Sequence, residues 1–124
     1  MLSKAMATLP VSDLGRARKF YEETLGLTVR QERPDGVVYE ADDGSTILVY
    51  PSQFAGTSQA TALSLSVDDV AAAAETLRGR GITFEEYDLP GLKTQNGIAE
   101  LGGNRGAWFK DLDGNILAIG DFPV

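Results

Sequence analysis

Two amphipathic segments, each entered from an apolar strand end and left through a glycine, follow one another along the chain. In "LPVSDLGRARKFYEETLGLTV" and in "LSVDDVAAAAETLRGRGITF", apolar residues recur at the spacing of one helix face. Asp13 and Asp69 stand where a helix N-cap is expected. Gly26 and Gly81 suit the left-handed position after each helix, and a strand follows directly. The pattern predicts two copies of a strand-helix-strand unit.

The repeat continues beyond the helices. Residues 36–50, "GVVYEADDGSTILVY", match residues 106–120, "GAWFKDLDGNILAIG". Each reads as a strand, a tight acidic turn and another strand, and in the second copy Gly114 and Asn115 are expected to accept the positive φ of the turn. Each unit is therefore β-α-β-β-β, and the chain is predicted to be one α+β domain over residues 1–124. Module 1 spans about residues 4–58 and module 2 about residues 59–124.

The second module carries an insert. Asp13 and Asp69 are 56 positions apart, whereas Gly44 and Gly114 are 70 apart, so about 14 extra residues lie within about residues 86–104. Glycine-containing turn dipeptides at 90–91, 96–97 and 102–103 predict a loop with several turns. Two interpretations stay open: a lid or ligand-contacting loop, with Glu100 and Arg105 closing over a ligand, or a passive or dimer-facing loop.

Composition removes several kinds of chemistry. The 124 residues include no cysteine and no histidine, which excludes disulfides, thiolate sites and a histidine base or metal ligand. The formal net charge is −7 and Lys/Arg residues form no cluster, so nucleic acid is not an expected partner. No apolar run reaches the ~18 residues of a membrane span, and the N-terminal stretch lacks a secretory apolar core. We expect a soluble cytoplasmic protein with no membrane partner.

The duplicated units, "VSDLGRARKFYEETLGL" and "FKDLDGNI" together resemble the vicinal oxygen chelate superfamily of glyoxalases, bleomycin-resistance proteins and extradiol dioxygenases. The resemblance covers about residues 5–119. It implies a fold in which two modules form a partly open, eight-stranded, barrel-like cup around a cavity, and it implies a homodimer.

Metal-dependent members of that superfamily place His and Glu ligands on strands that line the cavity. The resemblance puts Met6, Ala62 and Ala118 at three of these places, and Ile47 or Val49 at the fourth. None of these side chains offers an oxygen or nitrogen donor, and a Met thioether suits Cu(I) rather than the harder metals of the family. We therefore expect no metal and no other cofactor. A protein can share this fold without the family's metal chemistry, because the function depends on the site residues.

The same resemblance, combined with strand alternation, predicts the residues that line a ligand-binding cavity. These are Met6, Thr8, Tyr39, Ile47, Val49, Ala62, Ser64, Trp108 and Ala118. Two interpretations again stay open, because small side chains either leave room for a ligand or fill the interior. Trp108 is a candidate for stacking on a ligand, or for packing in the core or at a dimer contact.

The leading hypothesis is a metal-independent binding protein for an unidentified small molecule, cationic or aromatic, in the manner of the bleomycin-resistance branch. One alternative is a cofactor-independent lyase or isomerase, or another glyoxalase-like enzyme, that acts on a small oxygenated substrate through a carboxylate or Tyr. Another is a structural or regulatory subunit with a vestigial cavity. No catalytic residue stands out.

Overall fold

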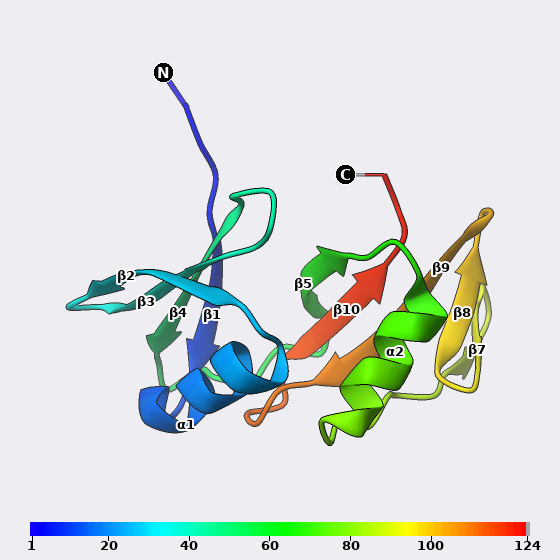
Figure 1. Cartoon of the computed structure of the whole chain (residues 1–124). Coiled ribbons are helices and arrows are strands. Elements are labelled where there is room, and N and C mark those ends of the chain that lie inside the picture. The colour runs from blue at the N-terminus through cyan, green and yellow to red at the C-terminus, as the bar shows by residue number, and fades with distance from the viewer. Residues whose placement is uncertain (124) are drawn as a thin grey trace. The chain divides into compact units, whose positions relative to one another are not determined.

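The computed structural model describes residues 1–123, and its contacts divide the chain into two compact units (Figure 1). Unit 1 comprises Met1–Thr57 together with the short segment Leu112–Asn115. Unit 2 comprises Ser58–Asp111 and the chain from Ile116 onward. The units follow the two predicted modules, except that one turn of module 2 belongs to unit 1.

Unit 1 is a four-stranded sheet with one helical segment. Its elements are β1 (Ala7–Val11), α1 (Leu14–Lys19), the π-helical turn η1 (Phe20–Thr24), β2 (Thr28–Arg33), β3 (Gly36–Glu40) and β4 (Thr46–Pro51). The strand order is β1-β4-β3-β2, with β1 and β4 parallel and the other pairs antiparallel. This is the predicted β-α-β-β-β order.

The fully buried core of unit 1 lies on the helix-covered face of this sheet. Leu9, Val49 and Tyr39 contribute from three adjacent strands, and Tyr21 contributes from η1. The Tyr21 and Tyr39 rings stack with centroids 6.1 Å apart. Alternation along the strands therefore sends these side chains beneath the helix and leaves Thr8 exposed on the other face.

Both helices begin and end as the sequence predicts. Asp13 (φ −135°, ψ 107°) and Asp69 (φ −134°, ψ 106°) have nearly identical N-cap geometry, and each side chain accepts a hydrogen bond of 3.0 Å from the backbone N–H three residues on. Gly26 and Gly81 have φ of 73° and 96°. The helix caps of the repeat are therefore confirmed.

Unit 2 contains α2 (Val70–Gly79) and a six-stranded sheet in the order β5-β10-β9-β8-β7-β6. The strands are β5 (Thr61–Ser66), β6 (Asp88–Leu89), β7 (Leu92–Gln95), β8 (Ile98–Leu101), β9 (Asn104–Lys110) and β10 (Ile116–Gly120). α2 packs against β9 and β10 through Val70, Ala74 and Leu77. Within residues 1–123 α2 is the longest helix, at 10 residues, and none there is long and apolar enough to cross a membrane.

The insert is not a loop, and this part of the prediction is wrong. The three turn dipeptides are where the sequence places them, but each is a two-residue turn between paired strands. Asn96 and Gly97 have φ of 56° and 78°, and Gly102 and Gly103 have φ of 58° and 89°, which are the positive values that tight hairpin turns require. Residues 1–123 consequently contain ten strands instead of the eight that were expected.

The inserted strands divide the strand that was expected after α2. Phe84 forms an isolated bridge with Phe109, and the Glu85 N–H donates to the Trp108 carbonyl at 2.8 Å. Beyond this point β8 takes over as the neighbour of β9. Between them, β6 and β7 form a hairpin over residues 87–97, called here the inserted hairpin.

Glu86 closes the base of the inserted hairpin. Its Oε1 accepts hydrogen bonds from the Gly97 N–H at 2.6 Å and from the Thr94 hydroxyl at 2.8 Å. The Thr94 N–H donates to the Tyr87 carbonyl at 2.9 Å. The two ends of the hairpin are therefore held together by polar contacts of their own.

The Asp113-Gly114-Asn115 turn is part of unit 1. Gly114 has the predicted positive φ of 92°, whereas Asn115 does not adopt positive φ. The Asn115 side chain is instead buried, donating to the Pro10 carbonyl at 2.7 Å and accepting from the Gly56 N–H at 3.2 Å. Asparagine is therefore needed here for its side-chain hydrogen bonds, and glycine supplies the turn geometry.

Candidate functional site

The strand register separates the predicted cavity residues of unit 1 into two groups. Thr8 pairs with Leu48, whereas Ile47 and Val49 pair with the neighbours of Thr8 on β1. Since side chains alternate along a strand, Ile47 and Val49 point to the opposite face from Thr8. Both are buried on the helix-covered face, so the prediction that they line a cavity with Thr8 is corrected. Met6, just before β1, is 36% exposed.

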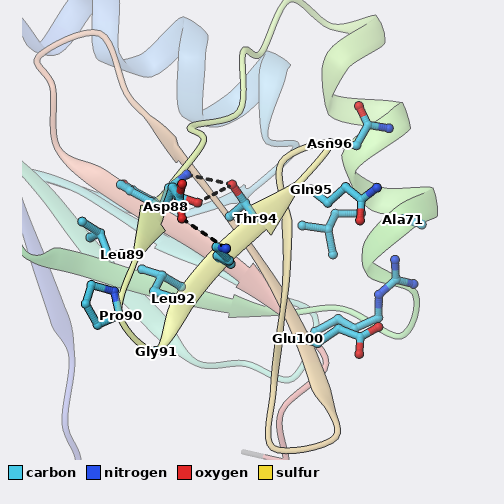
Figure 2. A pocket seen from close by; sticks show the side chains of 14 residues that line it. Ala71, Asp88, Leu89, Pro90, Gly91, Leu92, Thr94, Gln95, Asn96 and Glu100 are labelled. Atoms are coloured by element: carbon cyan, nitrogen blue, oxygen red, sulfur yellow. Dashed lines mark hydrogen bonds and ion pairs between the residues drawn. The ribbon is translucent and has the colours of Figure 1, made fainter.

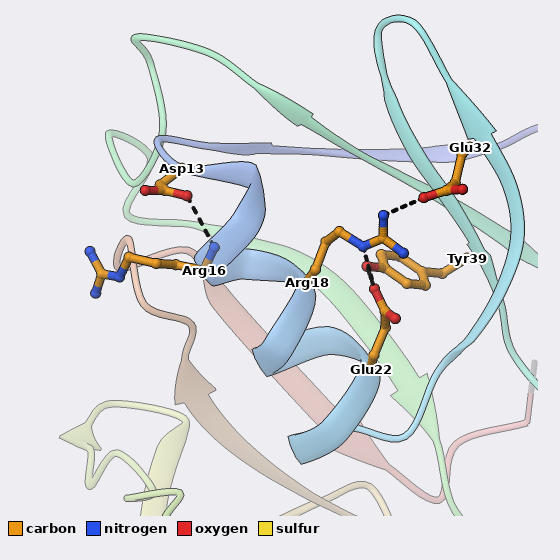
Figure 3. A network of polar contacts seen from close by, with 6 residues as sticks. All are labelled: Asp13, Arg16, Arg18, Glu22, Glu32 and Tyr39. Carbon is orange, nitrogen blue, oxygen red and sulfur yellow. Dashed lines mark hydrogen bonds and ion pairs between the residues drawn. The ribbon is translucent and has the colours of Figure 1, made fainter.

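Tyr39 is also on the helix-covered face and not in a cavity with Thr8. It pairs with Ile47, and its hydroxyl donates to Glu22 Oε2 at 2.7 Å (Figure 3). Arg18 Nε donates to the same oxygen at 2.7 Å, and Arg18 is also paired with Glu32. Tyr39 therefore belongs to a polar network that holds η1 against the sheet.

The electrostatics of this network differ from those of a general acid and base. The hydrogen bond from Arg18 holds the pKa of Glu22 below its usual range, which makes Glu22 a weaker base. Burial, followed by the hydrogen bond to Glu22, raises the pKa of Tyr39 above its usual range, which makes it a weaker acid. The pair is suited to structural support.

In unit 2, three predicted site residues do lie in one row across the sheet. Ser64 on β5 pairs with Ala118 on β10, and Ala118 pairs with Trp108 on β9. Their face is opposite to that of Phe109, which pairs with Phe84 beneath Arg78 of α2. The fourth residue, Ala62, falls at an irregularity where the β5–β10 register shifts.

Trp108 is packed by aromatic neighbours. The Tyr87 ring meets it edge to face with centroids 5.8 Å apart, and Trp108 is half-buried.

Phe122, on the chain after β10, lies against Gly106 and Gly120. A β-carbon at these two positions would come within 3.5 Å and 2.4 Å of the Phe122 ring. A β-carbon at residue 120 would therefore force the Phe122 ring to move.

Glu100 and Arg105 are strand residues and not part of a lid loop. They face each other directly across β8 and β9. Arg105 is two and four residues from Ala107 and Phe109, so its side chain lies on the α2 side of the sheet. The sequence singled out both residues, but the hairpin geometry that pairs them was not anticipated.

Beside these two residues the structure has a groove of about 1210 Å³ that runs between α2, the inserted hairpin and β8 (Figure 2). Figure 2 shows Gln95, Asn96 and Glu100 toward α2, with Leu89 and Pro90 at the far end of the hairpin. The groove is lined by Ala71, Tyr87, Asp88, Leu89, Pro90, Gly91, Leu92, Lys93, Thr94, Gln95, Asn96, Ile98, Glu100 and Arg105. Sequence reasoning missed most of these residues, although Asn96-Gly97 and Gly102-Gly103 between polar-apolar segments are hairpin signals.

The donor set does not fit the family's metal. Within residues 1–123 no three acidic side chains come together in a way that could hold a metal ion. Leu48, which the register places on the face of Thr8, has no donor atom either, and the same holds for Ala62 and Ala118. The residues at these strand positions therefore cannot supply the oxygen and nitrogen ligands of a divalent cation.

Comparison with known proteins agrees with this architecture. A sequence profile of the Glyoxalase/Bleomycin resistance protein/Dioxygenase superfamily matches residues 5–119. A search of curated proteins found no significant match.

Solved structures of similar fold include a binding protein and an enzyme. A superfamily member from Sphaerobacter thermophilus is 24% identical, with 97% of each chain covered and a TM-score of 0.73. TnmS3, an antibiotic binding protein from Streptomyces sp. CB03234, is 23% identical, with 96% of each chain covered and a TM-score of 0.66. The lactoylglutathione lyase from Agrobacterium tumefaciens is 20% identical, with 96% of this chain and 93% of that chain covered and a TM-score of 0.67.

The structure and the family profile point to the same fold. The profile matches residues 5–119, and this stretch contains the internal repeat, the two capped helices and the sheet of unit 1. The chain belongs to the Glyoxalase/Bleomycin resistance protein/Dioxygenase superfamily.

Proposed function

We propose that this protein binds a small organic molecule without a metal ion and without converting it. The observation that carries this proposal is the groove of about 1210 Å³ in unit 2, which is large enough for a drug-sized ligand. Its lining combines apolar side chains with amides and both signs of charge, as organic ligands require. The relative TnmS3 is described as an antibiotic binding protein, which makes ligand binding a known use of this fold.

Two observations favour binding over catalysis. The strand positions at which the superfamily resemblance places metal ligands carry Met6, Ala62 and Ala118, which cannot activate an oxygenated substrate through a metal. The Glu22–Tyr39 pair has pKa shifts opposite to those of a tuned base and acid. The lactoylglutathione lyase has a similar fold, but a shared fold does not by itself carry an activity from one protein to another.

The test is a thermal-shift screen of the purified protein in the presence of EDTA, against compounds that are aromatic, cationic or zwitterionic. A native-state ligand at 100 times its Kd is expected to stabilise the protein by about 2.7 kcal/mol. Each hit is then incubated with the protein and recovered by chromatography, and unchanged compound is the expected result. Chelator-resistant turnover would instead support the lyase or isomerase alternative, and the absence of any stabilising compound would support a vestigial site.

Metal addition provides the complementary measurement. Millimolar Ni²⁺, Zn²⁺, Mn²⁺ or Fe²⁺ is expected to leave the melting temperature unchanged, and the purified protein is expected to hold no stoichiometric metal. Stoichiometric metal, or a melting temperature raised by one of these ions, would overturn the metal-free part of the proposal.

The proposed biological unit is a cytoplasmic homodimer. Phe54 and Leu112 of unit 1 are 65% and 53% exposed, and large apolar side chains at the surface are candidates for contact with a second copy. Light scattering coupled to size-exclusion chromatography should give about twice the 13.2 kDa mass of the chain. A monomer mass at micromolar concentration would exclude this arrangement.

A further inference from the structure

We infer that Glu100 and Arg105 form a recognition pair for the two ends of a zwitterionic ligand, a molecule with an ammonium group and a carboxylate. The inference rests on the proposed function, because it names the ligand class that the groove accepts. It places recognition on the α2 side of the sheet, away from the face that carries Ser64, Ala118 and Trp108.

The first observation is the unused hydrogen-bonding capacity of Arg105. Its Nε is the one buried side-chain nitrogen or oxygen atom within residues 1–123 that has no hydrogen-bond partner. A buried donor without an acceptor is unfavourable, so a ligand oxygen that Arg105 Nε reaches by a small movement of the side chain would be stabilising. The guanidinium presents its donors in a planar fork that matches a carboxylate.

The backbone around Arg105 is fixed in advance. Its N–H donates to Asp121 Oδ1 at 2.7 Å, and its carbonyl accepts from the Asp121 N–H at 3.2 Å. The Asn104 side chain also donates to the Asp121 carbonyl at 3.2 Å. The Asp121 carboxylate therefore accepts from the backbone of Arg105, and Arg105 Nε keeps no acceptor.

The second observation is that Glu100 is directly across the strand pair and is also uncommitted. No hydrogen bond or ion pair of its carboxylate is found within the described part of the chain, residues 1–123. The other two charges in the groove, Lys93 and Asp88, are already paired at 3.6 Å. The groove thus presents one uncommitted carboxylate beside one uncommitted guanidinium.

Charge complementarity selects the ligand class. A purely anionic ligand would satisfy Arg105 but would meet the Glu100 carboxylate in a protein of formal charge −7. A purely cationic ligand would be repelled by Arg105 and would leave its Nε without an acceptor. A ligand that offers a carboxylate to Arg105 and an ammonium to Glu100 satisfies both, and the size of the groove leaves room for an organic body next to them.

Calorimetric titration with a matched set of probes tests the inference. The zwitterions are L-phenylalanine and the dipeptide L-phenylalanylglycine, in which the two charges are farther apart. Phenylpropionate lacks the ammonium group, and phenethylamine lacks the carboxylate. At least one zwitterion is expected to bind about tenfold or more tightly than both single-charge probes, because each charged end adds a charge-assisted hydrogen bond.

The variants separate the two ends of the ligand. Glu100→Gln should reduce zwitterion affinity about tenfold and leave phenylpropionate binding unchanged or stronger, whereas Arg105→Gln should weaken both. Arg105→Lys keeps the charge without the planar fork and should retain part of the affinity. Asp88→Asn and Lys93→Gln are the matched controls in the same groove, and they should change affinity less than twofold because that pair is exposed.

Each outcome decides between the two proposals. Equal binding of the zwitterions and one single-charge probe, or unchanged zwitterion affinity in Glu100→Gln, would overturn the recognition pair. Stabilisation by another library compound, with neither zwitterion bound, would overturn it while leaving the proposed binding function in place. Failure of every compound to bind would remove both.

Discussion

Replacement of Asn115 by alanine should destabilise the protein more than any other single change in its two acidic turns. Asn115 is 3% exposed, and its side chain makes two hydrogen bonds to distant backbone, one to the Pro10 carbonyl and one from the Gly56 N–H. Alanine removes both partners at once. The turn itself can still form, because Gly114 supplies its positive φ.

The size of the effect follows from what is left unpaired. Each backbone group that loses its partner in a largely buried place costs about 1–1.5 kcal/mol, so the expected loss is about 2–3 kcal/mol. For 124 residues, an unfolding entropy of about 2.1 cal/mol/K per residue gives about 0.26 kcal/mol/K near the midpoint. A loss of about 2.5 kcal/mol therefore lowers the melting temperature by about 10 °C.

The internal repeat supplies a matched control. Ser45 is the counterpart of Asn115 in the first acidic turn, but it is exposed. Within residues 1–123 its hydroxyl is bonded only to Asp43, two residues away. Ser45→Ala should cost about 0.5 kcal/mol or less, or about 2 °C. Differential scanning calorimetry on both variants, with urea unfolding as a second probe, gives the comparison.

A third variant tests the hydrogen-bond direction. Asn115→Asp keeps an acceptor for the Gly56 N–H but faces the Pro10 carbonyl with an oxygen that has no proton at neutral pH. Its stability deficit against wild type should narrow as the pH falls, because a protonated carboxyl can donate to that carbonyl. The reasoning would be refuted by an Asn115→Ala melting temperature within about 2 °C of wild type, or by an equal loss in Ser45→Ala.

Three further predictions use other contacts. In Gly56→Ala the new β-carbon would be placed 1.8 Å from the Asp113 carbonyl oxygen, at a φ of +68°. Urea unfolding should therefore show that the free energy of unfolding falls by about 2 kcal/mol or more. In the control Gly44→Ala the added atom meets nothing, and the expected loss is about 1 kcal/mol. The folded-state pKa of Glu22 is lowered, so the stabilisation that its carboxylate provides is present above the unfolded pKa of about 4.3 and is lost as the pH falls. The difference in unfolding free energy between wild type and Glu22→Gln should therefore shrink below about pH 5. A difference that stays constant with pH would contradict this. In Glu86→Gln the backbone amides of residues 87–97 should exchange hydrogen about tenfold faster, as measured by mass spectrometry, because the hydrogen bonds at the base of the hairpin are weakened. The exchange protection of α2 should stay the same. An equal increase in exchange over both segments would contradict the local role of Glu86.

The capped helices and the tight turns could be predicted from sequence because their signals are local. An aspartate before an amphipathic segment, or a glycine after one, satisfies backbone groups within a few residues. Asp13 and Asp69 accordingly have the same geometry to within a degree in φ and ψ. The position of the insert followed from the changed spacing of the repeat.

The face of the sheet on which each strand side chain lies could not be predicted as reliably, because it depends on the strand register. A shift of one residue sends every side chain of a strand to the other face. This is the reason why Ile47, Val49 and Tyr39 are under the helix, whereas Thr8 is not.

The groove was invisible to sequence reasoning for a different reason. Its lining comes from α2, the inserted hairpin and two strands, and these come together only after the hairpin has paired. Glu100 and Arg105 were singled out as charges near a glycine-rich segment, but their direct opposition depends on the two-residue turn between β8 and β9. Tertiary pairing, which has no local signature, decides both features.

The closed base of the inserted hairpin has a consequence for how this chain can change over time. The inserted hairpin begins after Glu86 and ends at Gly97, and these two residues are joined by a hydrogen bond of 2.6 Å. A segment whose ends are so close can be lengthened, shortened or exchanged at little cost in chain-closure entropy, since doubling its length adds only about 0.6 kcal/mol. Because this segment also forms a wall of the groove, new ligand preferences can arise by drift within it while α2 and strands β9 and β10 keep the sequences that fold them.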